Sequence, residues 1–155
     1  MPISIAITRR AFLGGISIFA AAAPATARSP DVYTGIVSST AVGGYDPVAY
    51  FREGKPVPGR SEVSWQWRGA NWRFATEANR ATFMAKPEAF APQYGGYCAW
   101  AVSQGYTAKG DPAYWKIVGG KLYLNYDARV QATWENDIPG HIAKADKNWP
   151  TVLSK

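Results

Sequence analysis

Two segments of this chain are patterned as β-hairpins, and they restrict its possible folds more than any other feature. In EVSWQWRGANWRFA, apolar and polar residues alternate on both sides of a tight turn, which predicts strands at Val63–Arg68 and Trp72–Ala75. In YWKIVGGKLYLNY, β-branched and aromatic residues predict strands at Tyr114–Val118 and Lys121–Tyr126, joined by Gly119-Gly120. The chain therefore pairs strands that are neighbours in sequence.

Other elements are expected around the first hairpin. Thr76 can cap a helix that runs from Glu77 to about Lys86, where Pro87 stops it. A short strand is expected before the hairpin, at Val48–Arg52.

The pattern becomes helical after the second hairpin. Val130, Trp134 and Ile138 are spaced by four and form an apolar stripe. Pro139-Gly140 is expected to end this helix, and a last short helix follows before Pro150. Hairpins and helices in non-alternating order predict an α+β fold, a small antiparallel sheet of two hairpins packed with several short helices.

The N-terminus has the pattern of an export signal. Arg9 and Arg10 precede Phe12-Leu13 and an apolar run over 16–23, and Ala25-Thr26-Ala27 offers a cleavage site. The paired arginines favour a twin-arginine signal of a bacterial protein exported in the folded state, and an ordinary Sec signal is the alternative. The run is too short to span a bilayer, so we expect a periplasmic or secreted protein with no permanent membrane anchor.

One domain is expected after this cleavable signal at 1–27. Residues 28–44 are expected to be an extended N-terminal arm and residues 45–155 a single domain, and we detect no internal repeat in the sequence. The formal net charge is +6, but the basic residues are scattered rather than clustered. We therefore expect no nucleic-acid partner.

Cys98 is the single cysteine of the chain and lies in QYGGYCAWAV. One interpretation is a buried small residue, because free cysteine is among the most buried residue types and burial protects a thiol from oxidation after export. The others are a metal or redox role and an intermolecular disulfide. Reactivity requires a lowered pKa, and the backbone amides of Gly95-Gly96 are the local feature that could supply it.

Metal binding is restricted by the number of available donors. A zinc cage needs four ligands, whereas this chain has one thiol and one imidazole, His141. Copper(I) accepts fewer soft ligands, so Cys98 with His141 or Met84 is the candidate set. Alternatively, His141 faces water or caps backbone groups at a helix start. A hydrolase is disfavoured, because the sequence has no G-x-S-x-G motif and a Cys98/His141 dyad would need a third group.

Two polar residues are expected to have local structural roles. Asp46 in GYDPVAY is predicted to accept backbone hydrogen bonds in a turn before Pro47. Asn125 in LYLNYD is predicted to close the second hairpin and lead into the following helix.

Three long stretches together resemble one family: GYDPVAYFREGKPVPG, WRFATEANRATFMAKPEAFAPQYGGYCAWAV and WKIVGGKLYLNYDARVQATWENDIPGHIAKADKNWP. They are similar to the exported, single-domain branch of the YHS-domain family. The resemblance implies a small α+β domain related to modules beside metal-transport ATPases and monooxygenase subunits, with a metal-handling role. Cys98 falls on the position of the family's proposed ligand cysteine. The chain departs from the metal-binding branches near its DPV turn, where Tyr50 and Phe51 stand instead of a further cysteine.

These observations favour a binding module over an enzyme. We expect Tyr94, Gly95, Gly96 and Tyr97 to contact a small ligand or cofactor, and Cys98 with His141 to hold a transition metal such as copper. The alternative is an aromatic-lined domain that binds an organic ligand or a protein, with Cys98 purely structural. A third hypothesis is a small redox or hydrolytic enzyme that uses Cys98.

Overall fold

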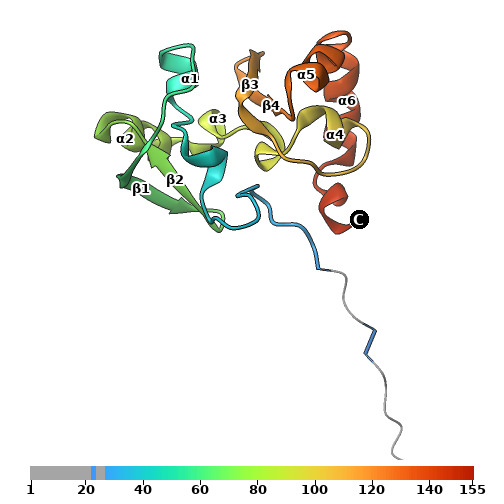
Figure 1. Cartoon of the computed structure of the whole chain (residues 1–155), viewed down its shortest axis with the longest axis horizontal. Coiled ribbons are helices and arrows are strands. Elements are labelled where there is room, and N and C mark those ends of the chain that lie inside the picture. The colour runs from blue at the N-terminus through green and yellow to red at the C-terminus, as the bar shows by residue number, and fades with distance from the viewer. Residues whose placement is uncertain (1–21, 24–26) are drawn as a thin grey trace, which may run out of the picture.

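A computed structural model describes residues 22–23 and 27–155 of this chain (Figure 1). The export signal predicted for residues 1–27 falls almost wholly outside these residues. Within the described part, none of the helices combines the length and apolar character required to cross a membrane.

The fold is α+β, as the sequence predicts. Two antiparallel hairpins form two separate two-stranded sheets, β1 with β2 and β3 with β4, rather than one sheet. In chain order, the elements of the described part are η1 (Ala41–Gly44), α1 (Ala49–Arg52), β1 (Arg60–Trp67), β2 (Ala70–Phe74), α2 (Glu77–Ala85), α3 (Pro87–Phe90), η2 (Gln93–Gly96), α4 (Ala99–Ser103), β3 (Asp111–Val118), β4 (Lys121–Asn125), α5 (Ala128–Glu135), α6 (Ile138–Asn148) and η3 (Thr151–Ser154).

The two halves of the structure repeat the same order of elements, so the expectation of no internal repeat is wrong for the fold. β3 begins at Asp111, 51 positions after β1 begins at Arg60, and β4 and α5 keep this offset from β2 and α2. We call residues 41–85 repeat 1 and residues 93–135 repeat 2. Figure 1 shows β1, β2 and α2 on one side of the molecule and β3, β4 and α5 on the other.

The strand registers of the two repeats agree. Trp65 faces Trp72 in the first hairpin, and Lys116 faces Tyr123 at the same place in the second. Both turns have two consecutive residues with positive φ, which lets a two-residue connection follow the twist of the strands. Such agreement over whole elements indicates a structural duplication.

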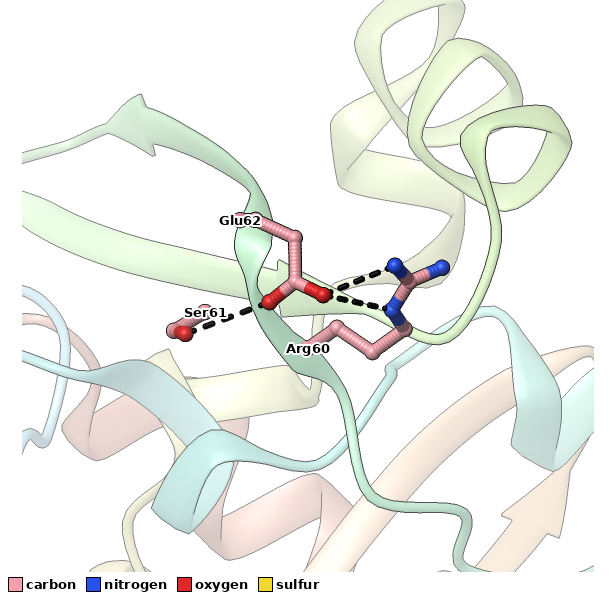
Figure 2. Close-up of polar contacts among 3 residues, drawn as sticks. All are labelled: Arg60, Ser61 and Glu62. Atoms are coloured by element: carbon pink, nitrogen blue, oxygen red, sulfur yellow. Dashed lines mark hydrogen bonds and ion pairs between the residues drawn. The ribbon is translucent and has the colours of Figure 1, made fainter.

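Side-chain hydrogen bonds hold the irregular register near the start of both longer strands. In β1 the Glu62 carboxylate accepts from Arg60 Nε at 2.9 Å and from Ser61 Oγ at 3.3 Å (Figure 2). The backbone N–H of Glu62 itself, and then the Arg60 guanidinium, hold the pKa of this carboxyl below its ordinary value. In β3 the carboxylate of Asp111 accepts from Ala113 N at 2.9 Å.

A glycine pair with positive φ precedes the short first helix of each repeat. The φ angles are 58° and 85° at Gly43-Gly44, and 62° and 82° at Gly95-Gly96. The preceding residues, Val42 and Tyr94, also have positive φ, which is costly for residues with a Cβ. Because the strain recurs in both repeats, it belongs to the fold rather than to one functional site.

The structure has two hydrophobic cores, the first of which also takes Leu122 and Leu124 of β4, and the helices α2 and α5 supply equivalent positions to them. Phe83 of α2 is fully buried in repeat 1, and Trp134 of α5 is fully buried at the same place in repeat 2. α6 adds Ala145 to the second core, packing against α4. Burial of these rings is the main favourable contribution to the stability of each half.

The first residues of the N-terminal arm are attached to repeat 2, whereas Ser39 further along accepts the N–H of Asn71 in β2 of repeat 1. Tyr33 N donates to Gly95 O at 2.9 Å, and Tyr97 Oη donates to Pro30 O at 2.9 Å. Ser29 of the arm also bonds the last helical turn of the chain, η3. These contacts fix the arm over the glycine pair of η2.

Two element predictions are wrong. Val48–Arg52 was predicted as a strand, but Ala49–Arg52 is the helix α1, because Asp46 accepts the N–H groups of Val48 and Ala49 at its start. Pro139-Gly140 does not end a helix. It lies in the first turn of α6, where a proline needs no hydrogen-bond partner for its nitrogen and Asp137 caps Gly140.

Candidate functional site

A small pocket of about 240 Å³ lies over Cys98. Its walls are almost wholly apolar, and two of its residues, Tyr106 and Tyr126, are 47% and 43% exposed at the surface. Cys98 itself is 1% exposed and forms the floor. The remaining walls come from Trp100, Ala101, Ala108 and Val130.

Local structure places the Cys98 sulfur at the start of α4. Cys98 is the residue before this helix, and its backbone N–H donates to Ala108 O at 2.9 Å. Burial raises the pKa of the thiol, while the backbone N–H groups of Ala101, Tyr126 and Trp100 act against this rise. The net shift is upward, so the neutral thiol is the stable form at neutral pH.

Asn125 is the polar neighbour of the sulfur. It is fully buried at the end of β4, as the sequence predicted for its position, and its Oδ1 lies 3.6 Å from Cys98 Sγ and 3.2 Å from Trp100 N. Its Nδ2 is buried with no hydrogen-bond partner among the described residues. This contact leaves no signal in the sequence, because the two residues belong to different elements.

His141 is engaged at the other end of α4. Its Nδ1 lies 3.1 Å from Ser103 Oγ, and Ser103 Oγ donates its proton to Trp100 O at 2.6 Å. The serine oxygen must therefore accept from the ring, which assigns the proton of the neutral imidazole to Nδ1. This serine is no activated nucleophile, because its proton is held by a backbone carbonyl.

The donors do not fit a copper site. Among the described residues, no three His, Cys, Asp or Glu side chains gather closely enough to hold a metal ion. Cys98 offers a single soft donor, which accepts hydrogen bonds, and His141 bonds Ser103 rather than the thiol. A stable copper(I) site needs two or three such ligands.

The four residues expected to contact a ligand lie beside the arm. Tyr94 Oη donates to Asp146 Oδ1 at 2.8 Å, and Gly96 and Tyr97 complete the turn under the arm. Tyr94 and Gly95 line a second, larger groove of about 810 Å³. None of the four residues from Tyr94 to Tyr97 lines the pocket over Cys98. The structure thus separates the expected ligand contacts from this pocket.

Comparison of the chain with known protein families, with curated proteins and with solved structures finds no match.

Proposed function

We propose that this chain is an exported binding module that takes a small apolar ligand in the pocket over Cys98. One observation carries the proposal: the pocket is walled by rings and methyl groups, and its floor is a thiol whose neutral form is favoured. Such a site favours apolar surface because water gains little from occupying it. Its volume fits a single ring or a short chain rather than a nucleotide.

Export is supported by the N-terminal pattern of paired arginines, apolar run and small-residue cleavage site. Expression of the full chain in a bacterium and N-terminal sequencing of the periplasmic protein test this part. A mature N-terminus at Arg28 is expected. A protein retained in the cytoplasm with its first residues intact would contradict it.

The YHS-domain resemblance is compatible with a binding role. In the metal-handling form of that role Cys98 would need a second soft ligand, which the residues around it do not supply. The apolar-ligand proposal therefore takes precedence over the copper hypothesis.

Ligand-observed NMR with phenol, indole and toluene as probes tests the pocket. Ala108→Phe fills the pocket from its wall and is expected to abolish saturable binding. Val57→Phe is the matched control, because Val57 is the equivalent position in repeat 1 and is not among the pocket residues. Binding should survive in Val57→Phe.

Two results would overturn the proposal. One is the lack of saturable binding of all three probes to the wild-type chain. The other is tight binding of one copper(I) ion that Cys98→Ala removes and Ala108→Phe leaves intact, because this would establish the sulfur rather than the apolar cavity as the site.

A further inference from the structure

Three aromatic rings line the pocket over Cys98, those of Trp100, Tyr106 and Tyr126. The ring centroids of Trp100 and Tyr106 are 6.3 Å apart and the two ring planes are nearly perpendicular, at 86°. Tyr106 and Tyr126 are each almost half exposed, so rings stand at the mouth of the pocket as well as inside it. The pocket therefore has the composition of an aromatic cage.

One of these rings already has a cation beside it. Lys109 Nζ lies 5.0 Å from the centroid of the Tyr126 ring, within the roughly 6 Å over which a cation is attracted to an aromatic face. The same ammonium lies 3.6 Å from Asp111 Oδ2, which balances its charge. The Tyr126 ring is thus accessible to a positive charge.

A carboxylate stands next to the cage. Asp127 follows Tyr126 in the chain, and its Oδ1 accepts from the backbone N–H of Val130, a residue of the pocket wall, at 2.8 Å. Within the part of the chain that the structure describes, no ion pair engages Asp127. Its negative charge therefore favours a cation over an anion at this end of repeat 2.

Repeat 1 has no rings at the equivalent positions. Val48 lies as far from the glycine pair of repeat 1 as Trp100 lies from that of repeat 2, and Ala75 precedes α2 as Tyr126 precedes α5. The fold that the repeats share therefore does not require the rings, which belong to repeat 2 alone.

We propose that the pocket over Cys98 binds a methylated ammonium group, such as the trimethylammonium head of choline or a betaine. This inference rests on the proposed function and names the ligand class of the same site. A quaternary ammonium has a positive charge beneath a surface of methyl groups and donates no hydrogen bond, so it suits walls of rings that offer it no acceptor. An unmethylated ammonium has three N–H donors, and burying them without acceptors is costly.

A series of ligands of one shape and three charges tests the proposal. The probes are choline, tert-butylethanol, in which a neutral tert-butyl group replaces the trimethylammonium group, and tert-butylacetate, which carries a negative charge. Their dissociation constants are measured with the purified chain by NMR titration. Choline is expected to bind about tenfold more tightly than the neutral alcohol, and the anion more weakly than the alcohol.

Tyr106→Leu tests whether the rings cause this preference. Leucine keeps an apolar wall but removes one aromatic face, so the preference for choline over tert-butylethanol is expected to fall about two- to fivefold while the alcohol still binds. Tyr114→Leu is the matched control, because Tyr114 is a partly exposed tyrosine of β3 that does not line the pocket. The preference should be unchanged in Tyr114→Leu.

The outcomes separate this inference from the proposed function. If the neutral alcohol binds as tightly as choline, or the anion binds most tightly, the methylated-ammonium ligand is excluded and the apolar-ligand proposal stands. If the wild-type chain binds none of the three probes, both are excluded. A preference for choline that Tyr106→Leu leaves unchanged also overturns the inference, because the rings would then not be its source.

Discussion

Gly95 lies directly under the carbonyl oxygen of Asp31, so close that a side-chain carbon on Gly95 would overlap the Asp31 backbone. The same glycine has φ +62° and accepts the N–H of Tyr33. The contact joins the N-terminal arm to η2, and it explains why the turn requires glycine for space as well as for backbone conformation.

Substitution of Gly95 is therefore expected to detach the arm. Gly95→Ala should lower the free energy of unfolding by more than the roughly 1 kcal/mol expected from positive φ alone, because the backbone of Asp31 must also move. Hydrogen exchange at Tyr33 and urea denaturation measure the two effects.

Gly119→Ala is the matched control for this prediction. Gly119 has φ +59° and open space around it, so only the conformational cost applies. Equal losses of stability in the two variants, with unchanged exchange at Tyr33, would show that the arm contributes nothing at this position.

The Asp46 carboxylate is expected to be a major source of stability in repeat 1. Asp46→Asn turns an acceptor into a group that presents N–H to backbone donors, and about 3 kcal/mol of unfolding free energy should be lost. Asp137→Asn is the control, because Asp137 is an exposed cap and asparagine caps as well as aspartate. Similar urea midpoints for the two variants would contradict the prediction.

Local patterns predicted the two hairpins and the cap of α2, whereas the duplication needed three-dimensional information. Thr76 caps α2 as expected, because a cap is a short-range interaction, and Asp127, for which no cap was predicted, holds the same place at α5. The repeats share few identities, since Phe83 matches Trp134 and Asp46 matches Cys98 only by position. The Gly-Gly-Tyr sequence that precedes both Asp46 and Cys98 was the signal that could have revealed the relationship.

Side-chain partners from distant segments could not be predicted in this way. Cys98 and Asn125 are 27 positions apart and meet because β4 runs beside the start of α4, with a parallel bridge between Cys98 and Leu124. The sequence assigned the amide donors near the thiol to Gly95-Gly96, but the groups that face the sulfur come from α4 and from Tyr126. Contacts between such distant segments follow from tertiary packing and leave no periodic pattern in the sequence.

Stability is expected to fall in alkaline solution because of buried tyrosines, and the pKa is raised most at Tyr50 and Tyr94. Burial raises the pKa of Tyr50 and of Tyr94, and the carboxylate of Asp146 adds to the rise at Tyr94. Each folded-state pKa lies above the unfolded value of about 10, so the folded chain retains protons that the unfolded chain releases. Their contribution is complete below about pH 10 and is lost as the pH rises beyond it.

Urea denaturation at a series of alkaline pH values measures this loss, and Tyr50→Phe should make the decline less steep. Tyr50 Oη donates to Pro112 O at 2.7 Å, so the variant also loses a hydrogen bond between the repeats at every pH. The lost hydrogen bond lowers the free energy of unfolding by the same amount at every pH, so it does not change the slope of stability against pH. A slope that is the same in the variant and the wild type would exclude Tyr50 as a source of the decline.

The N–H groups around the Cys98 sulfur are expected to make a hydrogen-bond acceptor at position 98 more important for stability than an apolar side chain. Cys98→Ser keeps an acceptor oxygen near Ala101 N and Tyr126 N and should cost less than about 1 kcal/mol of unfolding free energy. Cys98→Val fits an apolar interior but leaves both donors unpaired, and about 2 to 4 kcal/mol should be lost. Denaturation of the two variants under identical conditions gives the order directly. If Cys98→Val is more stable than Cys98→Ser, the sulfur stabilises the fold by packing alone. The N–H groups of Ala101 and Tyr126 then contribute nothing to stability through position 98.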